Sequence, residues 1–231
     1  MDYYDTYQTF SPWKLSGWND LINDVVIEEG ITSLGSNETF ANCPNIKSLN
    51  ISSTVTDLSA INDHWSNQEI CVESINVSEE NPDFASIDGV LFNKEKTTLI
   101  SYPINKPGEN YSVPDTVETI GEFAFSYNKN LVSIDIPDSV TSIENCAFEE
   151  SAALKDVALP AGITSIESYL FYNCPVLKNV TIPYGVESIG NGAFEYCTSL
   201  KNVEIPDSVT SIDSYVFMSC RQCLTTVLTQ K

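Results

Sequence analysis

Cysteines are the residues whose type and spacing most readily suggest chemistry. Cys174, Cys197 and Cys220 are equally spaced along the chain, and Cys220 begins a Cys-x-x-Cys pair with Cys223. Zinc sites use about four ligands, and this pair has neither a second pair nor a supporting histidine. We therefore expect an inward column of small apolar thiols and no metal or redox function. Stacked cysteines could also meet the distance that a disulfide tolerates, although with 7 cysteines a monomer keeps at least one thiol.

The one histidine, His64, is the other candidate for catalysis. It stands beside Trp65 and upstream of Cys71, so it could act as a base for a thiol nucleophile. A histidine in a polar insertion is better explained as a solvent-exposed loop residue. The chain has no nucleophile elbow, P-loop or dinucleotide fingerprint, and carboxylates are too abundant to identify a glycosidase pair by number. We predict no catalytic residues and no cofactor; an enzyme using Cys71 and His64 or scattered carboxylates is the minor alternative.

The charge balance narrows the choice of partner. The chain has 11 basic and 32 acidic residues, a formal net charge of −21. Such a surface repels phosphate backbones and anionic lipid head groups, so we expect no nucleic acid partner and no direct membrane binding. No apolar run is long enough to span a bilayer.

A 23-residue repeat between Val117 and Val227 must position the equally spaced Cys174, Cys197 and Cys220. In each copy a Val or Ile is followed three residues later by Ile and five residues after that by Phe. The phenylalanines of the five copies are Phe125, Phe148, Phe171, Phe194 and Phe217. A fixed period of this length is typical of a solenoid.

One copy shows what each coil should look like. In Leu177–Pro183, Val180 and Ile182 fall on one side of an extended segment, and Asn179 and Thr181 fall on the other. This pattern predicts a half-buried strand that ends at the proline, which cannot donate a ladder hydrogen bond.

The rest of the copy returns the chain to the next strand. Val186–Ile189 predicts a second short extended piece, and Asn191–Cys197 predicts about one turn of helix with Phe194 and Cys197 pointing inward. A lone coil buries too little apolar surface to offset its ordering cost, so coils must stack with their strands parallel.

The run Val-x-x-Ile-Gly-x-x-Ala-Phe-x-x-Cys-x-x-Leu-x-x-Val-x-Ile-Pro, nearly complete at Val186–Pro206, resembles the BspA-like leucine-rich repeat family. The resemblance covers most of the chain. It implies an α/β fold: a right-handed leucine-rich-repeat solenoid of stacked coils with short parallel strands and short helical turns. It also implies a protein on the surface of, or secreted from, host-associated microbes and linked to adhesion. The start of the chain lacks the features of a signal peptide, so we expect a cytosolic protein or, favoured by the family, a chain whose signal has been removed.

The chain divides into a cap and a solenoid. Residues 1–24 do not follow the repeat and predict an N-terminal cap; residues 25–231 predict the solenoid. Within it, residues 81–103 predict a three-stranded β-meander, in which Asp88-Gly89 is a strong hairpin signal. We expect this insert to interrupt the core without being needed for it.

The repeat also predicts a surface, here called the sheet face. It consists of the outward strand positions of successive coils. We predict that its binding residues are Ser133, Asp135, Asp156, Asn179, Thr181, Asn202 and Glu204. Beside them runs a lysine column of Lys155, Lys178 and Lys201. These lysines either neutralise the nearby Asp156 and Glu204 or orient an acidic ligand.

Two functions fit this pattern. The leading hypothesis is a non-enzymatic interaction protein, at the cell surface or secreted, that binds a protein or glycan through the sheet face and the hairpin insert. The alternative is a structural spacer or self-assembly module that joins end to end through the C-terminal coil, whose last copy shows no polar capping sequence.

Overall fold

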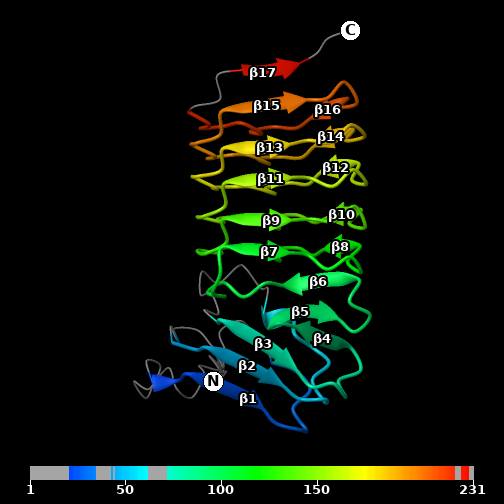
Figure 1. The fold of residues 1–231 in the computed structure, drawn as a ribbon, viewed down its shortest axis with the longest axis vertical. Coiled ribbons are helices and arrows are strands. Elements are labelled where there is room, and N and C mark those ends of the chain that lie inside the picture. Colours follow the sequence, from blue (N-terminus) through cyan, green and yellow to red (C-terminus); the bar gives the residue numbers. More distant parts are fainter. Residues whose placement is uncertain (1–20, 35–42, 44, 62–71, 222–224, 229–231) are drawn as a thin grey trace, which may run out of the picture.

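The computed structural model describes residues 21–34, 43, 45–61, 72–221 and 225–228, and they form a rod of stacked coils (Figure 1). In the repeated part, each coil contributes one strand to a parallel sheet and one shorter strand to the return side. The solenoid predicted from the repeat is therefore confirmed.

The regular region, residues 110–228, carries the sheet face. Its six strands lie parallel and in chain order. They are β7 (Asn110–Ser112), β9 (Ser133–Asp135), β11 (Asp156–Ala158), β13 (Asn179–Thr181), β15 (Asn202–Ile205) and β17 (Thr225–Leu228). On the return side lie β8 (Thr119–Ile120), β10 (Ser142–Ile143), β12 (Ser165–Ile166), β14 (Ser188–Ile189) and β16 (Ser211–Ile212). Val157 pairs with Val180, so the register steps by the 23-residue period.

The N-terminal sheet has the same kind of strand but a different spacing. Its strands are β1 (Asp24–Ile27), β2 (Ser48–Ile51) and β3 (Ser74–Val77), all parallel. Asp24 pairs with Ser48 and Ser48 with Ser74, so the spacing between coils is 24 and then 26. A short 3-10 helix, η3 (Ser59–Ile61), follows in the second coil. Residues 1–20, which hold most of the predicted cap, and the insertion at 62–71 lie outside the described residues.

A column of phenylalanines forms the core of the regular region. Successive rings stack at centroid distances of 5.1, 5.3, 5.5 and 5.5 Å from Phe125 to Phe217. Phe125, Phe148, Phe171 and Phe194 are fully buried. Burial of each such side chain stabilises the fold by about 1.5–3 kcal/mol, with a further contribution from the aromatic pairs. Equivalent residues of successive copies are thus direct neighbours along the rod.

The prediction of short helical turns is wrong. The segments between the return strands and the next sheet strands form a stack of β-turns, here called the turn ladder (residues 122–128, 145–151, 168–174, 191–197 and 214–220). Gly192 and Tyr196 have φ angles of 59° and 61°, which a right-handed helix cannot contain. The amides of Phe194 and Tyr196 donate instead to the carbonyls of Val216 and Met218 in the next coil, at 3.0 and 2.9 Å.

The meander has the three predicted strands, β4 (Phe84–Ile87), β5 (Val90–Asn93) and β6 (Thr98–Ser101). Neighbouring strands pair antiparallel, and Asp88 and Gly89 turn with φ angles of 49° and 75°, as the two-residue hairpin signal requires. Strand β6 then pairs parallel with β8, so the meander continues the return-side sheet.

The expectation that the core does not need the meander is wrong. Leu91 and Phe92 are adjacent in β5 and are both fully buried. Because successive strand residues point to opposite faces, Leu91 packs in the core of the N-terminal sheet while Phe92 packs in the core of the regular region. The meander is therefore the junction between two hydrophobic cores.

Candidate binding surface

The predicted sheet-face residues come together as two straight columns. In the first column, Ser133 pairs with Asp156, Asp156 with Asn179, and Asn179 with Asn202. Asn110 of β7 adds one more member before Ser133. Strand spacing puts the members of a column about 4.8 Å apart. For Asn202 the structure describes the backbone alone.

The second column runs parallel to the first, two residues further along each strand. Ser112 pairs with Asp135, and Ala158 pairs with Thr181. Asp135, Thr181 and Glu204 are exposed. None of the three makes a side-chain hydrogen bond to any described residue. Their polar groups are therefore available to a ligand.

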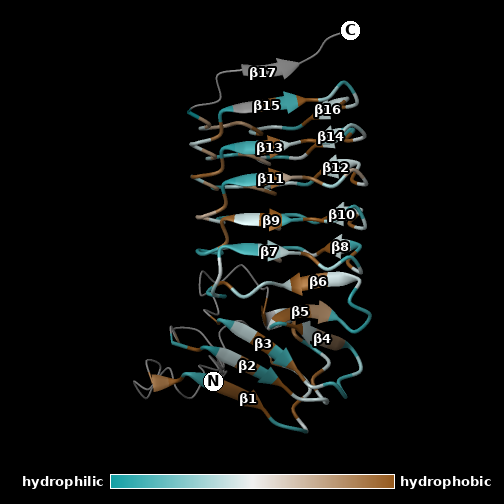
Figure 2. Ribbon diagram, in the orientation of Figure 1, coloured by the Kyte–Doolittle hydropathy of each residue, from teal (hydrophilic) through white to brown (hydrophobic). Residues whose placement is uncertain are grey.

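Hydrogen bonds fix parts of the first column. The side-chain amide of Asn179 donates to Oδ1 of Asp156 at 2.6 Å, and the Ser133 hydroxyl donates to Oδ1 of Asn110 at 2.6 Å. The ribbons of β7, β11 and β13 are largely coloured as hydrophilic, whereas that of β1 is coloured as hydrophobic (Figure 2). The backbone ladder thus orders the whole sheet face, and side-chain bonds add to it in the first column only.

The three predicted lysines also align. The amide of Lys178 donates to the Lys155 carbonyl at 2.7 Å, and the amide of Lys201 donates to the Lys178 carbonyl at 3.3 Å. All three side chains are exposed, and none forms an ion pair with a described residue. The lysine column therefore does not neutralise Asp156 or Glu204 in this structure, and its role toward an acidic ligand stays a prediction.

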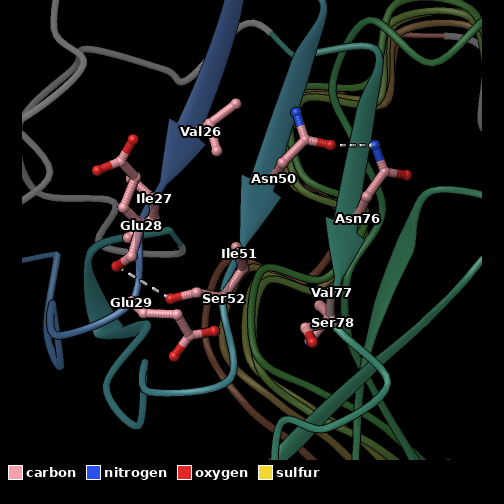
Figure 3. Close-up of a pocket in the computed structure, with 10 residues that line it drawn as sticks. All are labelled: Val26, Ile27, Glu28, Glu29, Asn50, Ile51, Ser52, Asn76, Val77 and Ser78. Carbon is pink, nitrogen blue, oxygen red and sulfur yellow. Dashed lines mark hydrogen bonds between the residues drawn. The ribbon is translucent and has the colours of Figure 1, made fainter.

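Sequence reasoning missed an open hollow of about 640 Å³ on the N-terminal sheet. Figure 3 shows Val26, Asn50 and Asn76 on neighbouring strands. Val26 is 66% exposed, and the Asn76 amide donates to Oδ1 of Asn50 at 3.0 Å. Glu28 and Glu29 lie along the same hollow. The only sequence signal was the change of period, because Val26, Asn50 and Asn76 are matching positions at an uneven spacing.

The cysteine column has a structural role. Sγ of Cys174, Cys197 and Cys220 lies 3.1, 3.0 and 3.0 Å from the carbonyl oxygen of Phe148, Phe171 and Phe194 respectively. Ser151, one period before Cys174, donates to the Phe125 carbonyl at 2.9 Å in the same way. Each side chain at this position thus satisfies a core carbonyl of the preceding coil.

The described cysteines form no disulfide bonds, and two of them, Cys146 and Cys197, are poorly suited to reaction. Cys43, Cys146, Cys174, Cys197 and Cys220 are unbridged. Hydrogen bonding with Cys174 and burial raise the pKa of Cys197, and burial followed by the charge of Glu149 raises the pKa of Cys146. Thiols with raised pKa values stay protonated and are weak nucleophiles and metal ligands.

The remaining candidates for chemistry cannot be placed. His64, Cys71 and Cys223 lie outside the described residues. Within the described ranges, no group of three or more His, Cys, Asp or Glu side chains is arranged to hold a metal ion. No helix in this part of the chain has the length and apolarity that crossing a membrane requires.

Several solved bacterial structures are similar to this chain. A leucine-rich repeat protein from Eubacterium ventriosum is 31% identical with a TM-score of 0.74, and the match covers 86% of this chain and 52% of that one. A leucine rich cell surface protein from Faecalibacterium prausnitzii is 27% identical with a TM-score of 0.71, covering 87% and 58%. The pneumococcal vaccine antigen PcpA, 21% identical with a TM-score of 0.72 over 86% and 55%, shares the fold. The chain thus spans between about half and three fifths of the length of these proteins.

Comparison with curated proteins finds no match. The family model for the BspA type leucine rich repeat region, in 6 copies, matches residues 14–106 and 104–223. These ranges include nearly all of the solenoid described above. The chain therefore belongs to the family of BspA type leucine-rich repeat proteins.

Proposed function

We propose that the chain is a non-enzymatic interaction protein, exposed at the cell surface or secreted, that binds a protein or glycan through its sheet face. The family supports this role. So do two proteins of similar structure, one a leucine rich cell surface protein and one a vaccine antigen. The proposed ligand is a protein or a glycan.

The observation that carries the proposal is the alignment of exposed polar side chains on a rigid sheet. Asp135, Thr181 and Glu204 stand on parallel strands and have no internal partner among the described residues. Because the strands already fix the backbone at these positions, a ligand does not have to order the backbone when it binds, and that part of the entropy cost is avoided. The lysine column beside them supplies positive charge on an otherwise acidic chain, which orients an acidic group of the ligand.

The meander takes a lesser part in this proposal than the sheet face. Nζ of Lys94 donates to the carbonyls of Glu79 and Asn81, at 2.8 and 2.5 Å, so this lysine holds the chain's own backbone. Glu95 remains exposed at the tip of the hairpin. We propose that the tip adds a contact at the edge of the ligand.

Self-assembly is the second candidate function. Ile212 is 42% exposed on the last described return strand, whereas Ile189, one coil earlier, is 1% exposed. Light scattering over a concentration series separates the two functions. A molar mass that grows with concentration supports assembly, and an unchanged monomer mass rejects it.

Binding to a glycan array and to a panel of immobilised host-surface proteins tests the leading proposal. The test variant combines Asp135→Ala, Thr181→Ala and Glu204→Ala, which change exposed side chains only. The matched control is Asn76→Ala on the N-terminal sheet. We expect the triple variant to lose binding and the control to keep it. Undiminished binding by the triple variant would place the site elsewhere.

A further inference from the structure

The turn ladder carries a second surface that the proposed function does not use. Phe171 of the turn ladder and Val180 of β13 are both buried in the same core, so the turn ladder and the sheet face are separate surfaces over one core. Three tyrosines gather there, Tyr169, Tyr172 and Tyr196, here called the tyrosine ridge. We propose that the tyrosine ridge, with the carboxylates beside it, binds a cationic peptide segment through an arginine side chain.

The rings of the ridge are arranged edge to face. The centroids of Tyr169 and Tyr172 are 5.7 Å apart with planes at 80°, and those of Tyr172 and Tyr196 are 5.7 Å apart at 84°. Tyr169 and Tyr196 are 38% and 36% exposed. Perpendicular rings that reach solvent offer aromatic faces in more than one direction, and a cation within about 6 Å of such a face is attracted to it.

The backbone does not require tyrosine at these positions. Tyr169, Tyr196 and the exposed Tyr215 have φ angles of 57°, 61° and 62°. The position equivalent to Tyr169 in the next coil is Gly192, and the position equivalent to Tyr196 in the preceding coil is Asn173. Glycine and asparagine adopt this conformation readily, whereas it is strained for a bulky residue. What tyrosine adds is therefore its ring.

Gly192 lets the ridge approach a carboxylate. A Cβ atom at Gly192 would fall 2.6 Å from Cε1 of Tyr169 and 3.1 Å from Oε2 of Glu195. The Tyr169 ring and the Glu195 carboxylate thus both lie against the same glycine. A ligand that contacts the ring is within reach of the charge.

Negative charge also surrounds the middle ring. Burial, and then the charges of Glu195 and Glu150, raise the pKa of the Tyr172 hydroxyl. Among the described residues, neither Glu150 nor Glu195 has a side-chain hydrogen bond or an ion pair. These carboxylates can therefore accept hydrogen bonds from a ligand.

Arginine matches both features of the ridge. Its planar guanidinium stacks on an aromatic face and pairs with a carboxylate through two parallel hydrogen bonds. A neutral sugar can stack on the rings but leaves the carboxylate charge uncompensated, and an acidic ligand is repelled by it. The chemistry of the ridge therefore favours a cationic peptide over a glycan.

The test is a titration of the full chain with an end-capped Gly-Arg-Gly-Arg-Gly peptide and with the same peptide in which citrulline replaces arginine. Citrulline keeps the planar shape but is neutral. We expect binding of the arginine peptide, weakened about two- to fivefold for each ring removed in Tyr172→Leu and Tyr196→Asn. The citrulline peptide should bind at least as weakly as the arginine peptide binds the variant that lacks both rings.

Matched controls separate the ridge from the overall acidic charge. Tyr184→Ala removes a tyrosine that is 79% exposed in a turn outside the ridge, so it should leave binding unchanged. Glu195→Gln should weaken binding, whereas Glu187→Gln, which removes the same charge from an exposed site elsewhere, should not. If thermal melting shows that the ring variants are unfolded, the comparison of Glu195→Gln with Glu187→Gln alone decides whether the ridge binds the peptide.

Three results would overturn the inference. They are equal weakening by Tyr184→Ala and the ring variants, equal binding of the citrulline peptide, and ring-dependent binding of a neutral oligosaccharide without binding of the arginine peptide. Sheet-face variants should not alter arginine peptide binding. A failure of the ridge is therefore distinguishable from a failure of the proposed function.

Discussion

The N-terminal sheet and the regular sheet are built from the same kind of parallel strand, yet they present different surfaces. The regular sheet keeps the 23-residue period throughout, and its outward side chains form flat polar columns. The N-terminal sheet has a longer and uneven period, and its outward side surrounds an open hollow with Val26 exposed. A constant period, more than the strands themselves, is what gives a continuous face.

Each of the two regions has one buried asparagine that bonds the backbone of neighbouring segments. Asn81 and Asn128 are fully buried, and each amide nitrogen donates to two backbone carbonyls while each amide oxygen accepts from two backbone amides. After Asn128, the matching positions hold Ser151 and then cysteines. In the regular coils that follow, the side chain at this position bonds a single core carbonyl of the preceding coil.

The largest expected effect is Phe171→Ala in the phenylalanine column. The ring is fully buried between Phe148 and Phe194, so we expect the free energy of unfolding to fall by about 3–5 kcal/mol. Phe84→Ala is the control, because that ring is only partly buried against the N-terminal core. Urea unfolding followed by circular dichroism measures both. An equal or larger loss for Phe84→Ala would contradict the difference between the two cores.

Leu91→Ala should separate the unfolding of the N-terminal region from that of the regular region. Its side chain joins β5 to the N-terminal core, so its loss should destabilise that region by about 2–4 kcal/mol while Phe92 keeps the meander on the regular core. We expect the urea unfolding curve to split into two transitions, with the N-terminal region first. A single unchanged transition would show that the Leu91 side chain is not what couples the two cores.

Alkaline pH should weaken the regular region before the N-terminal sheet. Among the described groups, those whose pKa is raised, chiefly by burial or by hydrogen bonding, are Tyr102, Tyr111, Cys146, Tyr172 and Cys197. For each of them the native state binds its proton more tightly than the unfolded state. Its contribution to stability is therefore complete below the unfolded pKa, near 9.0 for the thiols and 10.0 for the tyrosines, and is lost as the pH rises above that value.

Thermal melts between pH 7 and pH 11 measure this effect. We expect a constant melting temperature up to about pH 8.5 and a decline above it, because the thiols begin to titrate in the unfolded state there. The near-ultraviolet tyrosine signal should decline with it. A melting temperature that rises above pH 9 would contradict the assignment.

The smallest expected effect is at the cysteine column. Cys197→Ala removes the side-chain donor to the Phe171 carbonyl and should cost about 1 kcal/mol, whereas Cys197→Ser should cost less, because Ser151 makes the same bond earlier in the column. Asn81→Ser should cost more than either, since serine cannot make all four bonds of Asn81. Chemical unfolding of the three variants would test this order.

The features that sequence predicted are those that depend on period. Phe148, Phe171 and Phe194 are stacked neighbours because equal spacing leaves one arrangement in which their coils can pack. The strands of the meander followed from the hairpin signal Asp88-Gly89 and from the polar turn after Phe92. Its role in the core is also visible in the sequence, since Val90, Leu91 and Phe92 are consecutive apolar residues and indicate a strand buried on both faces.

Other features depend on contacts between coils and could not be predicted. Asn191–Cys197 has helical spacing of apolar residues, but bonds to the next coil hold Gly192 and Tyr196 at positive φ. The hollow on the N-terminal sheet arises from strand spacing that the sequence shows only as a change of period. The grouping of the sheet-face residues was predictable from the repeat, while their role in binding stays a prediction.

Lysine acetylation of the chain, with and without the first partner found on the array or panel, tests the sheet face most directly. Lys178 in the regular region and Lys47 in the N-terminal region are both exposed and both stand just before a sheet strand. We predict that the partner protects Lys155, Lys178 and Lys201 from acetylation and leaves Lys47 reactive. Protection of Lys47 with the three others unchanged would contradict the sheet face as the binding surface.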